Sequence, residues 1–162
     1  MSQSPITPNS KAARLKRLRS LSYMLDNAIP IPGTTYRVGI DPIMGLLPGA
    51  GDLLGTAFSA YIVLEAALLG LPRASLVRMV VNILLDELVG TVPLVGDWFD
   101  FAWKANTKNM QLLEAHLAAP QSSKRADWWF IILLLAGLLL FVLGITAISL
   151  FILGKIWQLI GG

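Results

Sequence analysis

Residues 128–154 read WWFIILLLAGLLLFVLGITAISLFILG, a stretch of 27 residues without a charged side chain. As an α-helix this stretch is roughly 40 Å long at about 1.5 Å per residue, which exceeds the hydrocarbon core of a bilayer, about 30 Å thick. Lys124 and Arg125 come before it, and Lys155 and Trp157 follow. Cations and tryptophans at both ends are typical of a membrane span. We therefore predict a C-terminal transmembrane helix.

The composition of the whole chain agrees with a membrane protein and removes many enzyme classes. Hydrophobic residues make up 55% of the 162 residues and charged residues 14%, against roughly 25% charged residues in a soluble domain. The chain has no cysteine and a single histidine, His116, which excludes disulfides, thiolate nucleophiles and clusters of histidine ligands. It also lacks the short motifs of phosphate-binding loops, serine hydrolases and zinc proteases. We expect a protein that is not an enzyme and uses no cofactor.

A twelve-residue sequence motif occurs twice before the apolar stretch. Residues 41–52 read DPIMGLLPGAGD and residues 86–97 read DELVGTVPLVGD, so the pattern D-x3-G-x2-P-x2-G-D recurs at an offset of 45. Internal repeats of this length usually mark two copies of one supersecondary unit. The repeated positions are the first candidates for a site: Asp41, Gly45, Pro48, Gly51 and Asp52 in one copy, and Asp86, Gly90, Pro93, Gly96 and Asp97 in the other.

The repeated aspartates have two interpretations. An aspartate after a Pro-Gly break can cap the next helix, because its carboxylate accepts hydrogen bonds from the free N–H groups there; Asp52 and Asp97 fit this role. Alternatively, helices broken inside apolar sequence expose carboxylates and carbonyls to an ion, as in many transporters. An ion bound there would meet oxygen ligands, including Asn82 and Asn106, which suit magnesium, calcium or manganese.

Asp86 and Glu87 fit the capping interpretation less well, because aliphatic residues flank them within a predicted helix. Spacing of four along a helix gives such charges neighbours on one face. Ion pairing that locks the helices together is the structural alternative to an ion pathway. In that case Glu65 would meet one of the cations Arg78, Lys104 and Lys108. The candidate buried polar partners are Arg78, Asn82, Glu65, Asp100 and Lys104.

Proline and glycine divide the chain into predicted helices. We expect an irregular connector over residues 27–39, helices over residues 53–71 and 73–92, and an amphipathic helix over residues 97–117. The fold class is all-α, with two tandem broken-helix hairpins and a C-terminal transmembrane helix. The expected division is a basic, partly disordered segment (1–22), a repeat-containing helical domain (23–117), a hinge (118–127) and the transmembrane helix (128–157).

The distribution of cations predicts a topology with the N-terminus in the cytoplasm, at a plasma or inner membrane. Both three passes and a single span with half-embedded helices satisfy this rule. Lys11, Arg14, Lys16, Arg17 and Arg19 alternate with leucines, so this segment either lies on an anionic leaflet or only holds the N-terminus inside. No nucleic-acid-reading module accompanies these cations.

Three stretches resemble a known family. They are RVGIDPIMGLLPGAGDLLG (37–55), RMVVNILLD (78–86) and VPLVGDWFDFAWKANTKN (92–109), and they are similar to the family named domain of unknown function 4112. The resemblance covers about residues 23–117 and implies a small membrane-associated domain. It implies no biochemical activity.

These observations favour a non-enzymatic membrane scaffold or assembly partner whose repeat forms a rigid helical block. The alternative is a small oligomeric ion or proton pathway that uses the repeated aspartates. The partners expected are the lipid bilayer and a second copy of the chain or another membrane protein. Gly137, Gly144, Ala147 and Gly154 form a stripe of small residues, which is either an approach surface for another helix or simply lipid-exposed.

Overall fold

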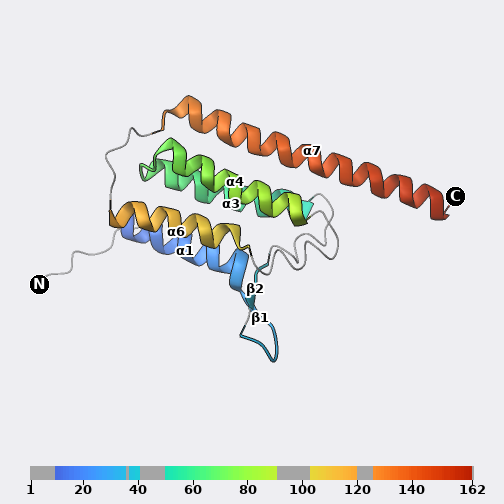
Figure 1. The fold of residues 1–162 in the computed structure, drawn as a ribbon, viewed down its shortest axis with the longest axis horizontal. Coiled ribbons are helices and arrows are strands. Elements are labelled where there is room, and N and C mark those ends of the chain that lie inside the picture. The colour runs from blue at the N-terminus through green and yellow to red at the C-terminus, as the bar shows by residue number, and fades with distance from the viewer. Residues whose placement is uncertain (1–9, 36, 41–49, 91–102, 120–125, 162) are drawn as a thin grey trace, which may run out of the picture.

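The computed structural model describes residues 10–35, 37–40, 50–90, 103–119 and 126–161. These residues are mostly helical (Figure 1), which confirms the predicted class at that level. The elements are α1 (Lys11–Asn27), β1 (Ile29–Pro30), β2 (Arg37–Val38), α3 (Ala50–Leu68), α4 (Arg73–Gly90), α6 (Ala105–Ala118) and α7 (Trp128–Gly161).

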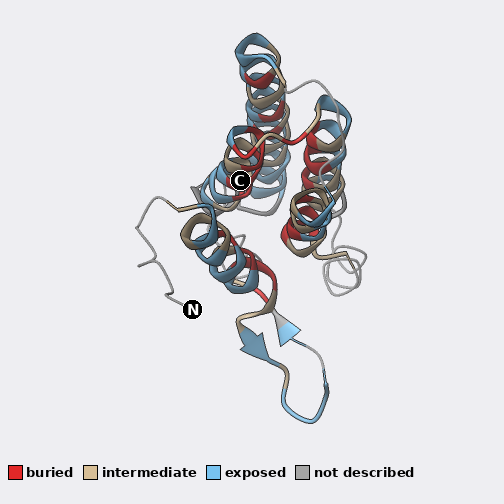
Figure 2. Ribbon diagram, turned by 90° about the vertical axis from the view of Figure 1, so that its left-hand side faces the viewer, coloured by how far each residue is buried: buried red, intermediate tan, exposed pale blue. Residues whose placement is uncertain are grey.

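The helices form three layers with their axes roughly aligned (Figure 1). α1 and α6 lie side by side, α3 and α4 form the next layer, and α7 runs along α3 and α4. Buried residues, red in Figure 2, follow the faces that the helices turn toward one another. Ile62, Leu76 and Leu113 are fully buried at the centre, while Ile131, Leu138 and Val142 of α7 complete the core. The candidate membrane helix is therefore also part of the packed structure.

α3 ends earlier than the sequence predicted. The expected helix reached Leu71 with Pro72 as its terminator, whereas α3 stops at Leu68. Gly70 has φ 97°, the left-handed conformation that glycine adopts without steric cost. Its N–H donates to the carbonyl of Ala67 at 3.0 Å and the N–H of Leu71 to that of Ala66 at 3.1 Å, which is a Schellman motif. Glycine therefore ends the helix, and proline follows it.

α1 packs inside the protein rather than standing apart from it. Leu18 and Leu25 are each 1% exposed, because this face of the helix lies against α6 and α3. The apolar side that a helix on an anionic leaflet would insert is thus covered by protein. The domain division predicted between residues 22 and 23 falls inside α1.

The connector after α1 contains a short antiparallel hairpin, although an irregular segment was predicted. Ile29 pairs with Val38 and Pro30 with Arg37. Gly39 follows and lies against the end of α1, where a Cβ at this position would fall 1.2 Å from the carbonyl oxygen of Leu25. Only glycine allows this close approach of two backbones.

α3 is helical from Ala50, whereas its predicted start was residue 53. α4 begins at Arg73 as expected and is described to Gly90; residues 91 and 92, where the predicted helix ended, lie outside the described part of the chain. α6 begins at Ala105, while the predicted helix began at Asp97; residues 91–102 lie outside the described part of the chain. α7 continues to Gly161, beyond the predicted end at residue 157.

Candidate functional site

Much of the repeated motif lies outside the described residues. This applies to Asp41, Gly45, Pro48, Pro93, Gly96 and Asp97, and also to Asp100. The backbone of Gly51 and Asp52 lies in the first turn of α3, and Gly90 is the last residue of α4. The capping and ion-binding roles of these residues, and the two broken-helix hairpins, stay predictions.

The mid-helix acids of α4 are described. Asp86 and Glu87 are both half-buried. The Thr56 hydroxyl of α3 donates a hydrogen bond to the Glu87 carboxylate. Thr56 is 5% exposed, so this contact joins α3 and α4 through a buried hydroxyl.

Glu65 has a partner that the sequence reasoning did not name. We expected the partner of Glu65 to be Arg78, Lys104 or Lys108. Glu65 pairs with Arg14 of α1 instead, and the Arg14 Nη2 atom lies 2.6 Å from Glu65 Oε2. The two side chains are 22% and 13% exposed. The pair joins α1 to α3 across a partly buried contact. The expectation was wrong because the helix that faces Glu65 is α1, a neighbour set by tertiary packing.

A polar cluster of seven residues, missed as a unit by the sequence reasoning, joins α1, α4 and the start of α6. Its members are Asp26, Asn27, Asn82, Lys104, Asn106, Thr107 and Asn109. Asp26 of α1 accepts from the Asn106 amide at 2.9 Å and from the Thr107 backbone N–H at 2.6 Å. The first N–H groups of a helix have no partner within the helix. Asp26 therefore caps α6 from a different helix.

Burial raises the pKa of Asp26 above its ordinary value of 3.8. The hydrogen bonds from Asn106 and Thr107 and the charge of Lys104 oppose this shift, and desolvation is the larger effect. The side chain is 7% exposed. The ionised form consequently costs folding free energy at neutral pH.

The second half of the cluster joins α6 to α4. Asn109 is fully buried and its amide donates to the carbonyl of Met79 at 3.1 Å. Asn82, predicted as a candidate buried polar partner, donates to the Asn109 side-chain oxygen at 2.8 Å. This places one polar bridge in the contact between α4 and α6.

The residues before α6 have a strained backbone held by polar contacts. Lys104 has φ 29°, which is unusual for a residue with a side chain. Its ammonium donates to the Asn27 side-chain oxygen and, at 2.9 Å, to the carbonyl of Arg37. The neighbouring Trp103 indole N–H donates to the Asn82 carbonyl at 3.2 Å. Lys104, predicted as a candidate buried polar partner, thus links the start of α6 to α1 and β2.

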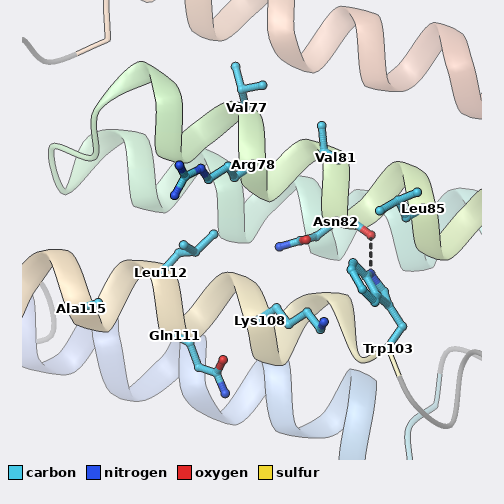
Figure 3. A pocket seen from close by; sticks show the side chains of 10 residues that line it. All are labelled: Val77, Arg78, Val81, Asn82, Leu85, Trp103, Lys108, Gln111, Leu112 and Ala115. Atoms are coloured by element: carbon cyan, nitrogen blue, oxygen red, sulfur yellow. Dashed lines mark hydrogen bonds between the residues drawn. The ribbon is translucent and has the colours of Figure 1, made fainter.

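A groove of about 500 Å³ opens beside the polar cluster, between α4 and α6 (Figure 3). Val81, Leu85 and Leu112 give it apolar walls. Arg78 and Lys108 also line it, and the Lys108 ammonium lies 3.3 Å from the centre of the Trp103 ring. The full lining set is Val77, Arg78, Val81, Asn82, Leu85, Trp103, Lys108, Gln111, Leu112 and Ala115.

The described contacts of these sites are hydrogen bonds and charge interactions. Within the described residues, no three His, Asp or Glu side chains are close enough to hold a metal ion together. Asn106, predicted as a possible oxygen ligand, donates a hydrogen bond to Asp26 through its amide nitrogen. The polar cluster orients helices, and the groove offers two cations beside an apolar wall.

The geometry defines a mostly helical protein with one helix, Trp128–Leu159, long and apolar enough to cross a membrane among the residues that the structure describes. The chain belongs to the family "Domain of unknown function (DUF4112)", whose model matches residues 14–117. The match runs from α1 through α6 and leaves α7 outside. Searches of curated proteins and of solved structures give no match. The resemblance found in the sequence is confirmed.

Proposed function

We propose that this protein is a non-enzymatic membrane scaffold: α7 holds it in the bilayer, and the helices α1 to α6 form a rigid block that presents surfaces to a partner. The main support for this proposal is the exposed apolar face of α7. Leu133 and Leu140 are each 69% exposed and Phe151 is 67% exposed. Apolar surface of this extent needs lipid or another protein around it.

The internal contacts support a rigid block. The polar cluster and the Arg14–Glu65 pair connect helices far apart in the chain, and their polar groups bind one another. Such networks fix one arrangement of helices because each member needs its partner. A scaffold requires a surface of constant shape, and these contacts favour one.

A single span agrees better with the packing than three passes. With three passes, the turn between α3 and α4 and the segment before α7 would lie on opposite sides of the membrane. Arg73, at the start of α4, pairs with Asp127, just before α7. A hydrocarbon core of about 30 Å cannot separate two groups in contact. We infer that both lie on the cytoplasmic side, together with the basic N-terminus.

Self-association belongs to the same proposal. A Cβ added at Gly137, Gly144 or Gly154 would meet nothing within 4 Å, so these residues of α7 leave space for an approaching helix. The occupant we propose is a second copy of the chain. The measurement is the mass of the protein in lipid nanodiscs, and a strictly monomeric wild type would remove this part of the proposal.

The decisive experiment compares membrane attachment with ion flux. Full-length protein should resist extraction by carbonate, and truncation after Ala126 should weaken attachment. Liposomes containing the wild type should show no flux of protons, magnesium, calcium or manganese. Release by carbonate contradicts the anchor. Wild-type flux that Asp86→Asn abolishes without lowering the melting temperature contradicts the scaffold and supports the ion pathway.

The side of the membrane on which each segment lies can be measured by labelling single cysteines, since the sequence contains no cysteine of its own. Single variants Ser10→Cys and Ala74→Cys should react with a membrane-impermeant maleimide only after the cytoplasmic side is opened. Gly161→Cys should react from the outside. Labelling of Ala74→Cys from outside would contradict the single span.

A further inference from the structure

The groove between α4 and α6 combines two properties that a purely structural crevice does not need. Five of its ten lining residues are aliphatic, namely Val77, Val81, Leu85, Leu112 and Ala115. Arg78 and Lys108 supply two positive charges, and none of the described lining residues is acidic. Its volume of about 500 Å³ falls within the range of roughly 300–1,000 Å³ typical of ligand sites.

The two cations are available to a ligand. Arg78 is exposed and, within the part of the chain that the structure describes, forms no ion pair. The Lys108 ammonium lies over the Trp103 ring at 3.3 Å, a cation–π contact that orients it and leaves its N–H groups able to donate. Trp103 is itself fixed by its hydrogen bond to the Asn82 carbonyl. The Lys108 end of the groove is thus built in advance of binding, while the Arg78 side chain points toward the other end (Figure 3).

The groove is oriented toward the membrane helix. Val77 and Val81 are 41% and 43% exposed, and in Figure 3 both side chains point from α4 toward the α7 ribbon. Lys108 and Leu112 line the groove from α6 on the opposite side. α4 packs directly on α7. A ligand with an acyl chain therefore meets valine on the side of α7 and Lys108 on the side of α6, while Arg78 lies on α4 beside the valines.

We propose that this groove binds an anionic phospholipid of the surrounding bilayer. The phosphate binds the Lys108 ammonium, and the exposed Arg78 side chain, which points toward the other end of the groove in Figure 3, turns toward it, so that charge-assisted hydrogen bonds from both hold it. An acyl chain follows Val81 and Val77 toward α7. Tryptophan favours the headgroup region because one end of its ring is apolar and the other donates a hydrogen bond. The site depends on attachment to a membrane and not on whether the protein is a scaffold.

The test uses full-length, delipidated protein in a mild non-ionic detergent. Phosphatidylglycerol or phosphatidylcholine is added in mixed micelles, and the melting temperature gives the apparent affinity. The wild type should bind phosphatidylglycerol more tightly than phosphatidylcholine. The double variant Arg78→Gln/Lys108→Gln should bind phosphatidylglycerol roughly 100-fold more weakly, at about tenfold per cation.

The matched control is Lys16→Gln/Arg17→Gln, which removes two exposed cations of α1 outside the groove. It should retain the wild-type preference. Equal binding of both lipids by the wild type, or an equal loss in the control, would overturn the site. Val77→Asn/Val81→Asn tests the apolar wall, and an unchanged affinity for phosphatidylglycerol would refute the proposed path of the chain.

Two further measurements separate the sources of the signal. Inorganic phosphate alone should give no comparable stabilisation, and an equal effect would assign the site to a free anion instead of a lipid. Brominated phosphatidylglycerol should quench the fluorescence of Trp103, measured as the quenching lost in Trp103→Phe. This measurement does not depend on whether the variant Arg78→Gln/Lys108→Gln folds. If the protein binds the lipid but Trp103 is not quenched, the lipid binds elsewhere.

Discussion

Replacing Asn109 by alanine tests whether the polar cluster stabilises the helical block. The side chain is fully buried, donates to the Met79 carbonyl at 3.1 Å and accepts from the Asn82 amide at 2.8 Å. Each net hydrogen bond contributes about 0.5–1.5 kcal/mol, and the half-buried Asn82 amide then lacks its acceptor. The free energy of unfolding should fall by about 2–4 kcal/mol.

The corresponding decrease in melting temperature is roughly 5–15 °C, because about 1 kcal/mol shifts a chain of this size by about 2–4 °C. The assay is thermal unfolding in detergent followed by circular dichroism. Gln111→Ala is the control, since Gln111 is exposed on the same helix, and its change should stay within about 0.5 kcal/mol.

A double-mutant cycle completes this experiment. Asn82→Ala and the double variant should reveal a coupling of about 0.5–1.5 kcal/mol between the two amides. If Asn109→Ala destabilises the protein no more than Gln111→Ala, the cluster does not hold α4 and α6 together, and the argument for a rigid block fails with it.

Two other predictions concern close packing and pH. Gly39→Ala should lower the stability by about 1–3 kcal/mol because its Cβ would meet the Leu25 carbonyl; a melting temperature equal to that of the wild type would contradict this. Since burial raises the pKa of Asp26 above 3.8, its contribution is largest below that pH and is lost as the pH rises through the folded-state pKa. The melting temperature of the wild type minus that of Asp26→Asn should accordingly fall from acidic to neutral pH, and a rise would show that hydrogen bonding outweighs desolvation.

Local sequence signals predicted the helices well because helix breaks have local causes. The end of α3 shows both the strength and the error of this reasoning. Pro72 was recognised as a terminator, but Gly70 sets the end, two residues earlier, through its left-handed backbone. The signal was present, since glycine just after a helix followed by proline is a known ending.

The polar cluster could not be predicted in the same way. Asp26 and Asn106 are 80 residues apart, and an isolated aspartate or asparagine in a helix shows no periodicity that identifies its partner. Asn82 and Asn106 were singled out as oxygen donors, which is correct chemistry, but their partners follow from how α1, α4 and α6 pack. The same limit applies to Glu65, whose partner Arg14 lies 51 residues away.

The position of α7 changes how an anchor of this protein should be understood. A simple tether has no contact with the domain that it carries, and its removal leaves that domain intact. α7 instead buries Ile131, Leu138 and Val142 against α3 and α4, while Leu150 to Leu159 are exposed throughout and extend beyond the other helices (Figure 1). One helix thus completes the core with its first half and leaves its apolar second half exposed, which is the half that the proposed anchor would offer to lipid. Under that proposal a force on α7 in the bilayer is transmitted to α3 and α4, so membrane attachment and the shape of the helical block would be coupled.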